Sequence, residues 1–169
     1  MANPTMTLIA SNTVGSGGVS SVTFSSIPST YTDLKVVMSL RTNSAANYDN
    51  FTMSINSSTT SFTFIQIYGS GSAASSYAYT GGIIADIDAA NNTVSTFSNL
   101  DIYIPNYTAA NNKSYSVDSV QENNATLAYA EMLAGLWSNT SAITSLTFTS
   151  NNGSFVQYST FYLYGISNS

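Results

Sequence analysis

Few side chains in this sequence could carry chemistry, and the acids of the segment IIADIDAANN are the first to consider. Asp86 and Asp88 are two residues apart, so a strand would place both carboxylates on one face. With an amide oxygen from the Asn-Asn pair that follows, they could bind calcium, which prefers oxygen ligands. No glycine-spaced calcium loop accompanies the pair. We therefore favour a solvated strand face over a metal site.

Most catalytic chemistries lack their residues in this chain. It contains no histidine and no cysteine, which excludes Ser-His-Asp and Cys-His catalysis and the zinc sites built from these residues. The Gly/Ser segments 15–18 and 69–72 lack the lysine of a phosphate-binding loop. Glycosidases need two carboxyl groups roughly 5–10 Å apart, and Glu122 and Glu131 would meet only by an accident of folding. We expect no enzyme, no cofactor and no metal.

Aromatic side chains are the more promising binding groups. The chain holds 12 Tyr, 8 Phe and 1 Trp. SSYAYTGG places Tyr77 and Tyr79 on one face of a Gly- and Ser-rich segment, and Trp137 precedes the polar stretch SNTS. Tyrosine is both apolar and hydrogen-bonding, which suits sugar stacking and protein contacts alike. These three residues could form a platform for a carbohydrate. The alternative, which we favour, is that they cap the core or line a subunit contact.

Charge narrows the range of partners. Charged residues make up 7% of the 169 residues, and the net charge is −5. The three basic residues, Lys35, Arg41 and Lys113, are scattered along the chain, so no basic patch can bind nucleic acid or an anionic membrane. The start, MANPTMTLIASN, lacks the basic region and apolar run of a signal peptide. No apolar run approaches the ~20 residues of a membrane span. We expect synthesis and folding in a cytoplasm.

Strands must position these residues, because the dominant hydrophobic period is two. Alternation is clearest over 34–40, and shorter runs follow at 51–55, 100–104, 115–120, 146–148 and 161–166. Two more strands are expected on either side of the Gly/Ser segment 15–18. The run 62–68 switches its apolar face midway, which predicts a bulge or a strand covered on both faces. Segment 127–137 is read as a long strand, with a short helix as the alternative.

About eight to ten short strands with turn residues between them predict an antiparallel sandwich or barrel. The turn Asn151-Asn-Gly153 is the strongest hairpin signal, because Asn and Gly tolerate positive φ. No linker or repeat divides the chain. We expect a single domain over residues 1–169, with residues 1–4 as a loose N-terminal arm.

The segment SSIPSTYTDLKVVMSLRT is interpreted as a structural corner that leads from one sheet to the other. Ile27 packs under a turn whose proline fixes φ, and Tyr31 returns its ring to the core. Asp33, Lys35 and Arg41 then belong to the outer face, where Asp33 and Lys35 are close enough for a weak surface pair.

This corner is part of a wider resemblance. The stretch LIASNTVGSGGVSSVTFSSIPSTYTDLKVVMSLRT, then FTMSINSS, IQIYGSGSAASS and the ending FYLYGI, resembles a recurrent family of small structural proteins of tailed-bacteriophage virions. The resemblance implies a jelly-roll fold and a structural role on the particle, as a capsid decoration (cement) protein or a fibre component. It also implies a homotrimer that contacts the major capsid protein. It transfers no ligand residue.

Composition agrees with such a role, because interface cores are poor in charge and rich in Tyr and Met. A surface with so little lysine leaves strand edges open to pairing. We therefore expect a non-enzymatic virion protein, made in the bacterial cytoplasm, that stabilises a capsid shell through subunit contacts. The alternative is a tail-fibre or receptor-binding carbohydrate module that uses Tyr77, Tyr79 and Trp137.

Overall fold

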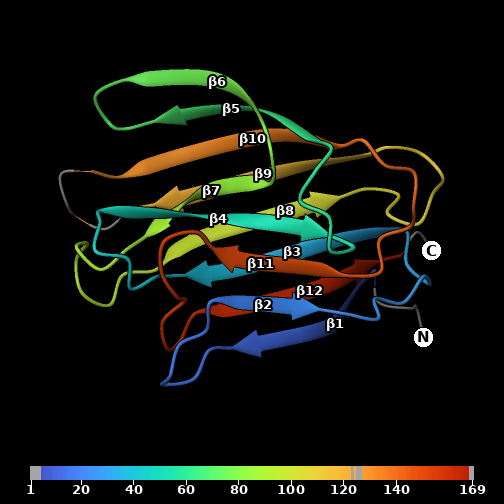
Figure 1. Cartoon of the computed structure of the whole chain (residues 1–169), viewed down its shortest axis with the longest axis horizontal. Coiled ribbons are helices and arrows are strands. Elements are labelled where there is room, and N and C mark those ends of the chain that lie inside the picture. The colour runs from blue at the N-terminus through green and yellow to red at the C-terminus, as the bar shows by residue number, and fades with distance from the viewer. Residues whose placement is uncertain (1–4, 123, 125–126, 168–169) are drawn as a thin grey trace.

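Twelve β-strands make up the computed structural model, which describes residues 5–122, 124 and 127–167 (Figure 1). The strands are β1 (Met6–Thr13), β2 (Ser21–Phe24), β3 (Asp33–Leu40), β4 (Tyr48–Ile55), β5 (Phe62–Gly69), β6 (Ala74–Thr80), β7 (Ile83–Asp88), β8 (Ser98–Ile104), β9 (Lys113–Gln121), β10 (Tyr129–Trp137), β11 (Leu146–Ser150) and β12 (Thr160–Ile166). None of the described residues form a helix long and apolar enough to cross a bilayer. The predicted arm, residues 1–4, lies outside the described residues.

The strands form two antiparallel sheets packed as a sandwich. The larger sheet has the order β1-β12-β3-β8-β9-β10-β5-β6, and the smaller has the order β2-β11-β4-β7. The first strand pairs with the last, the second with the second to last, and the fifth with the tenth. This nested pairing is that of a jelly roll, so the predicted fold is confirmed. The strand number exceeds eight to ten, partly because the edge strand β6 buries none of its side chains fully.

Period-two alternation fills the space between the sheets. The inward residues of β3 are each at most 1% exposed: Leu34, Val36, Met38 and Leu40. Aromatic rings join the two layers, since Phe148 of β11 stacks on Phe161 of β12 with ring centroids 6.0 Å apart. The buried apolar residues of both sheets form one hydrophobic cluster. Segment 127–137 supplies β10, which confirms the strand and not the helix.

The proline-bearing segment is the predicted corner, because it connects β2 of the smaller sheet to β3 of the larger one. Ile27 is 6% exposed, and its backbone N–H donates to the carbonyl oxygen of Thr144 at 3.0 Å. The ring of Tyr31 covers Gly165, where an added Cβ would lie 2.2 Å from the ring. The absence of a side chain at Gly165 thus allows the corner to close over the end of β12.

Of the charged residues in this segment, Lys35 lies on the outer face as predicted, whereas Asp33 and Arg41 are buried. Asp33 is buried and accepts a hydrogen bond of 2.6 Å from the hydroxyl of Tyr103. Lys35 therefore pairs with Asp101 at 3.2 Å, and not with Asp33. Arg41 is also buried, although we placed it on the outer face. Its guanidinium donates to main-chain carbonyl oxygens of the β7–β8 loop, those of Ala90, Asn92, Thr93 and Thr96. The β7–β8 loop covers this position, and Arg41 is therefore not exposed.

The predicted hairpin at 151–153 is wrong. The strand that precedes this turn is β11, and the next strand, β12, lies in the other sheet. The two asparagines bond to β4 instead. Asn151 Nδ2 donates to Asn50 Oδ1 at 2.7 Å, and Asn152 Nδ2 donates to Asp49 Oδ1 at 2.8 Å. Their role is to hold the start of the crossover to the first residues of β4.

Candidate functional site

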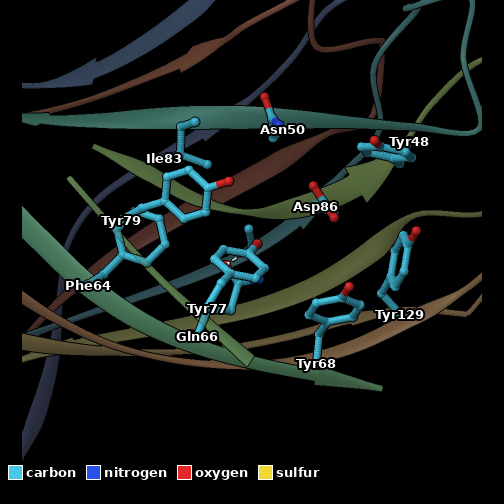
Figure 2. A pocket seen from close by; sticks show the side chains of 11 residues that line it. Tyr48, Asn50, Phe64, Gln66, Tyr68, Tyr77, Tyr79, Ile83, Asp86 and Tyr129 are labelled. Carbon is cyan, nitrogen blue, oxygen red and sulfur yellow. Dashed lines mark hydrogen bonds between the residues drawn. The ribbon is translucent and has the colours of Figure 1, made fainter. Parts of the chain in front are cut away.

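The two sheets differ in width, and this difference creates a cleft. The larger sheet has eight strands against four in the smaller, and β5 and β6 extend past the last strand of the smaller sheet (Figure 1). Their inward side chains face β7 across a cavity of about 320 Å³ (Figure 2). The residues that line it are Tyr48, Asn50, Phe64, Gln66, Tyr68, Tyr77, Tyr79, Ile83, Ala85, Asp86 and Tyr129. We call this space the tyrosine cleft.

Five tyrosine rings form a continuous arc around the cleft, four of them on β10, β5 and β6 of the larger sheet and Tyr48 on β4 of the smaller sheet. Successive ring centroids are 5.9 Å apart for Tyr48 and Tyr129, 5.7 Å for Tyr129 and Tyr68, 5.8 Å for Tyr68 and Tyr77, and 4.9 Å for Tyr77 and Tyr79. Each pair meets edge to face, a geometry worth about 0.5–1.5 kcal/mol beyond burial. The rings therefore hold one another in place without a ligand.

Strand register explains how the arc is assembled. On β5, Phe64, Gln66 and Tyr68 point inward, and β6 pairs Tyr79 opposite Phe64 and Tyr77 opposite Gln66. The Tyr77 hydroxyl donates to Gln66 Oε1 at 2.7 Å, which fixes the ring. Aliphatic side chains would be expected here if the smaller sheet covered this face. Tyrosine suits the overhang, because one end of its side chain is apolar and the other is wetted.

A pair of carboxyl groups lies at the back of the cleft. Asp86 extends from β7 toward the rings (Figure 2), and its backbone N–H donates to Glu131 Oε2 of β10 at 3.0 Å. The two side chains also share a hydrogen bond. Burial raises the pKa of Asp86 to about 6, and burial together with the charge of Asp86 raises the pKa of Glu131 to about 8. Near neutral pH, the two carboxyl groups therefore share one proton and carry one negative charge between them.

Cations are engaged elsewhere in the described part of the chain. Lys35 pairs with Asp101, Arg41 donates to loop carbonyls, and Lys113 Nζ donates to the carbonyl oxygens of residues 109 and 111 at 2.7 and 2.6 Å. None of the three lines the cleft. The negative charge at its back thus has no basic counterion among the lining residues.

Two of the three predicted aromatic residues belong to this site. Tyr77 and Tyr79 lie side by side in the cleft, and Tyr79 is 59% exposed. The prediction that Trp137 contacts a ligand or partner is wrong. Its side chain is 1% exposed and stacks on Phe62 inside the sandwich, with ring centroids 6.3 Å apart. Trp137 occupies an inward position of β10, so its ring belongs to the core, as the alternative interpretation of these aromatic residues predicted.

The two acid pairs considered from the sequence, Asp86 with Asp88 and Glu122 with Glu131, do not form. Asp86 pairs with Glu131 instead. Asp88 is fully buried, and its Oδ1 accepts a 2.5 Å hydrogen bond from Asn92 Nδ2. The prediction that Asp88 lies on a solvated strand face is therefore wrong. Glu122 is exposed, and its Oε1 accepts the backbone N–H of Asn124. Among the described residues, no group of three or more His, Cys, Asp or Glu side chains could hold a metal ion.

A second surface of interest is the outside of β9, β10, β5 and β6. Its most exposed large apolar side chains, at 47–62%, are those of Ile65, Ile67, Val120 and Met132. Ile67 lies opposite Met132, and Ile65 lies opposite Ala134. We call these four residues, with Ala74, Ala78, Ala130 and Ala134, the outer apolar face. Asp118 is the one outward charged side chain on the described residues of these strands.

This face explains the run whose apolar residues switch sides at 62–68. The register of β5 with β10 and β6 is unbroken, so the predicted bulge is wrong. The other prediction, that this strand is covered on both faces, is also wrong for the isolated chain, because Ile65 and Ile67 are exposed. Apolar side chains thus project from both faces of β5, and only the inner set lies against the core and the cleft.

Comparisons with known proteins add little. No family model and no curated protein matches the sequence. Among solved structures, the chain is similar to the galectin LEC-6 of Caenorhabditis elegans, with 10% identity, TM-score 0.34, and 94% of this chain and 96% of that chain covered. It is also similar to CG-16, a homodimeric agglutinin from chicken liver, with 13% identity, TM-score 0.26, and 80% and 98% covered. Likenesses this weak carry no argument about function.

Proposed function

We propose that the chain is a non-enzymatic structural protein of a tailed-bacteriophage virion, a capsid decoration protein that packs its outer apolar face against the shell. The observation that supports this most is the exposure of Ile65, Ile67 and Met132, which lie next to one another on β5 and β10. Contiguous exposed apolar surface of this kind marks interaction sites. The assignment to a virion is based on the sequence resemblance to structural proteins of tailed-bacteriophage particles.

The size of the face favours several copies acting together. Four strands spaced at about 4.8 Å and seven residues rising about 3.3 Å each give a face of roughly 19 by 23 Å. That area is on the order of 440 Å², small beside the roughly 800 Å² per partner of a standard interface. Joined copies multiply a weak contact, which supports the homotrimer. The edge strand β6, with no charged residue or proline, offers a neighbouring copy a strand to pair with.

The test uses charge substitutions on exposed residues of matched character. Ile67→Glu alters the outer apolar face, and Val94→Glu alters a loop residue that is 84% exposed elsewhere. Each protein is mixed with particles of the encoding phage that lack this chain, and bound protein is measured by cosedimentation. We expect wild type and Val94→Glu to bind and Ile67→Glu to remain in solution. Equal binding by both variants, or no binding by wild type, would overturn the proposal.

A second candidate function is carbohydrate binding at a tail fibre, and the tyrosine cleft favours it. Tyr77 and Tyr79 offer ring faces, while Gln66 and Asn50 add amide groups beside them. Stacked rings with a few polar groups are the usual components of a small-ligand site. A glycan array read with wild type and Tyr79→Ala tests this function. Loss of signal in the variant supports it, and an empty array contradicts it.

A further inference from the structure

We infer that the tyrosine cleft binds an organic ammonium group, with the tyrosine arc around the cation and the Asp86 carboxylate as its counterion. This inference goes beyond the virion role and does not depend on where the protein sits on a particle. The class includes quaternary ammonium compounds such as choline and sugars that bear a free amine. Both present the same chemistry to the site, a positive charge on a small polar body.

Charge decides against anionic ligands. Asp86 is half-buried and lines the cleft, and the pair that it forms with Glu131 carries one negative charge near neutral pH. Glu131 behind it adds a hydrogen bond but no positive charge. A phosphate or a sugar acid entering here would leave like charges close together in a partly desolvated space, which is unfavourable. A cation in the same place is attracted by this carboxylate, and binding is favoured.

The rings provide the second element of the site. A cation is attracted to the face of an aromatic ring within about 6 Å of its centroid, and quaternary ammonium groups are bound by cages of such rings. Adjacent rings of the arc, from Tyr48 to Tyr79, are inclined at 60° to 89° to one another. Such a chain presents faces as well as edges to the cavity, and Asp86 extends from β7 toward the four rings of the larger sheet (Figure 2).

The size and remaining lining of the cleft define the rest of the ligand. A cavity of about 320 Å³ is at the lower end of the range for ligand sites, so it suits a small molecule or one terminal group of a larger one. Gln66 and Asn50 also line it, and their amides can bond to hydroxyl groups on the ligand. Choline and amino sugars each combine a cation with hydroxyl groups.

The binding test compares a cation with a neutral molecule of the same shape. Choline and 3,3-dimethylbutan-1-ol differ only in that carbon replaces the charged nitrogen. Titration of the full chain, followed by chemical shifts of the tyrosine rings, should show choline binding at least tenfold more tightly. Glucosamine against glucose repeats the comparison on a sugar. A preference in the first pair alone points to quaternary ammonium compounds, and one in the second pair alone to amino sugars. No preference in either pair overturns the inference.

Variants then assign the effect to the site. Asp86→Asn removes the charge but keeps the shape, and should lower the affinity for the preferred cation at least tenfold. Asp118→Asn removes a carboxylate from the outer apolar face and should leave it unchanged. Tyr79→Leu, at an exposed position that tolerates substitution, should weaken cation binding and provides a test if Asp86→Asn fails to fold. Undiminished cation binding in either cleft variant contradicts the assignment.

The pH dependence gives an independent readout, because choline itself does not titrate. The groups that face Asp86 are Glu131 from β10, Asp49 from β4, and the tyrosine hydroxyls of the cleft, of which that of Tyr77 has its pKa raised to about 12. The pKa of Asp86 is about 6, so choline binding should weaken as the pH falls from 7 to 5. Binding that does not change over this range contradicts Asp86 as the counterion.

Discussion

Replacing Glu131 by glutamine should remove most of the pH dependence of folding between pH 6 and 7.5. Glu131 is 6% exposed and has its pKa raised from 4.5 to about 8 by burial and by Asp86. A raised pKa means that the folded chain keeps a proton that the unfolded chain has lost. Its stabilising contribution is complete below about pH 4.5 and disappears as the pH rises through about 8.

The magnitude follows from one proton. Each proton held only by the folded chain lowers its stability by about 1.4 kcal/mol per unit of rising pH. Over 1.5 units the loss is about 2 kcal/mol, and at roughly 2–4 °C per kcal/mol for a chain of this length the melting temperature falls by about 4–8 °C. With no histidine or cysteine, the background in this range comes from the α-amino group, with a pKa of about 8, and, near pH 6, from Asp86, whose pKa is raised to about 6.

Urea unfolding at pH 6.0 and 7.5 measures the effect, with the fluorescence of the single, buried Trp137 as the signal. Glutamine can still accept the Asp86 N–H and can donate to its carboxylate, so Glu131→Gln should fold. It should lose little stability between the two pH values. Glu122→Gln, at an exposed acid, should retain the wild-type loss. A wild-type protein equally stable at both pH values, or a Glu131→Gln variant with the wild-type loss, would refute the reasoning.

Three further predictions concern packing, loop anchoring and metals. Gly135→Ala should destabilise the fold by about 1–3 kcal/mol, because an added Cβ would lie 2.1 Å from the Tyr115 ring. Thermal melting measures the loss of stability, and an unchanged melting temperature would contradict this contact. Arg41→Met should cost at least about 2 kcal/mol, since several loop carbonyls lose their donor, with increased hydrogen exchange in residues 89–97; an unaltered loop would contradict its anchoring role. EDTA should leave the melting temperature unchanged, and a fall would restore the calcium site at Asp86 and Asp88.

The sequence predicts those features that depend on local alternation. Leu34 to Leu40 must alternate because one face of the strand packs in the core, and the corner around Ile27 follows from its proline and apolar residues. Tyr77 and Tyr79 share a face for the same reason, which is why both reach the cleft. Even the outer apolar face has a local signal, since Ile65 and Ile67 lie between inward residues of β5.

Features that depend on pairing between distant strands are not predictable in this way. Asp86 and Glu131 meet because β7 lies against β10 across the sandwich, and neither neighbourhood in the sequence identifies the other. Trp137 shows the opposite error: the polar residues that follow it suggest exposure, but its position on β10 points inward. The turn at 151–153 has hairpin residues, yet tertiary packing sends the next strand to the other sheet.

The proposed role is tested most directly by a cryo-EM map of the tailed-bacteriophage virion to which the proposal assigns this chain. The account predicts copies of this twelve-stranded sandwich on the shell, with Ile65, Ile67 and Met132 buried against a neighbouring protein. Particles that lack the chain, or copies in which β5 and β10 face solvent, would contradict it.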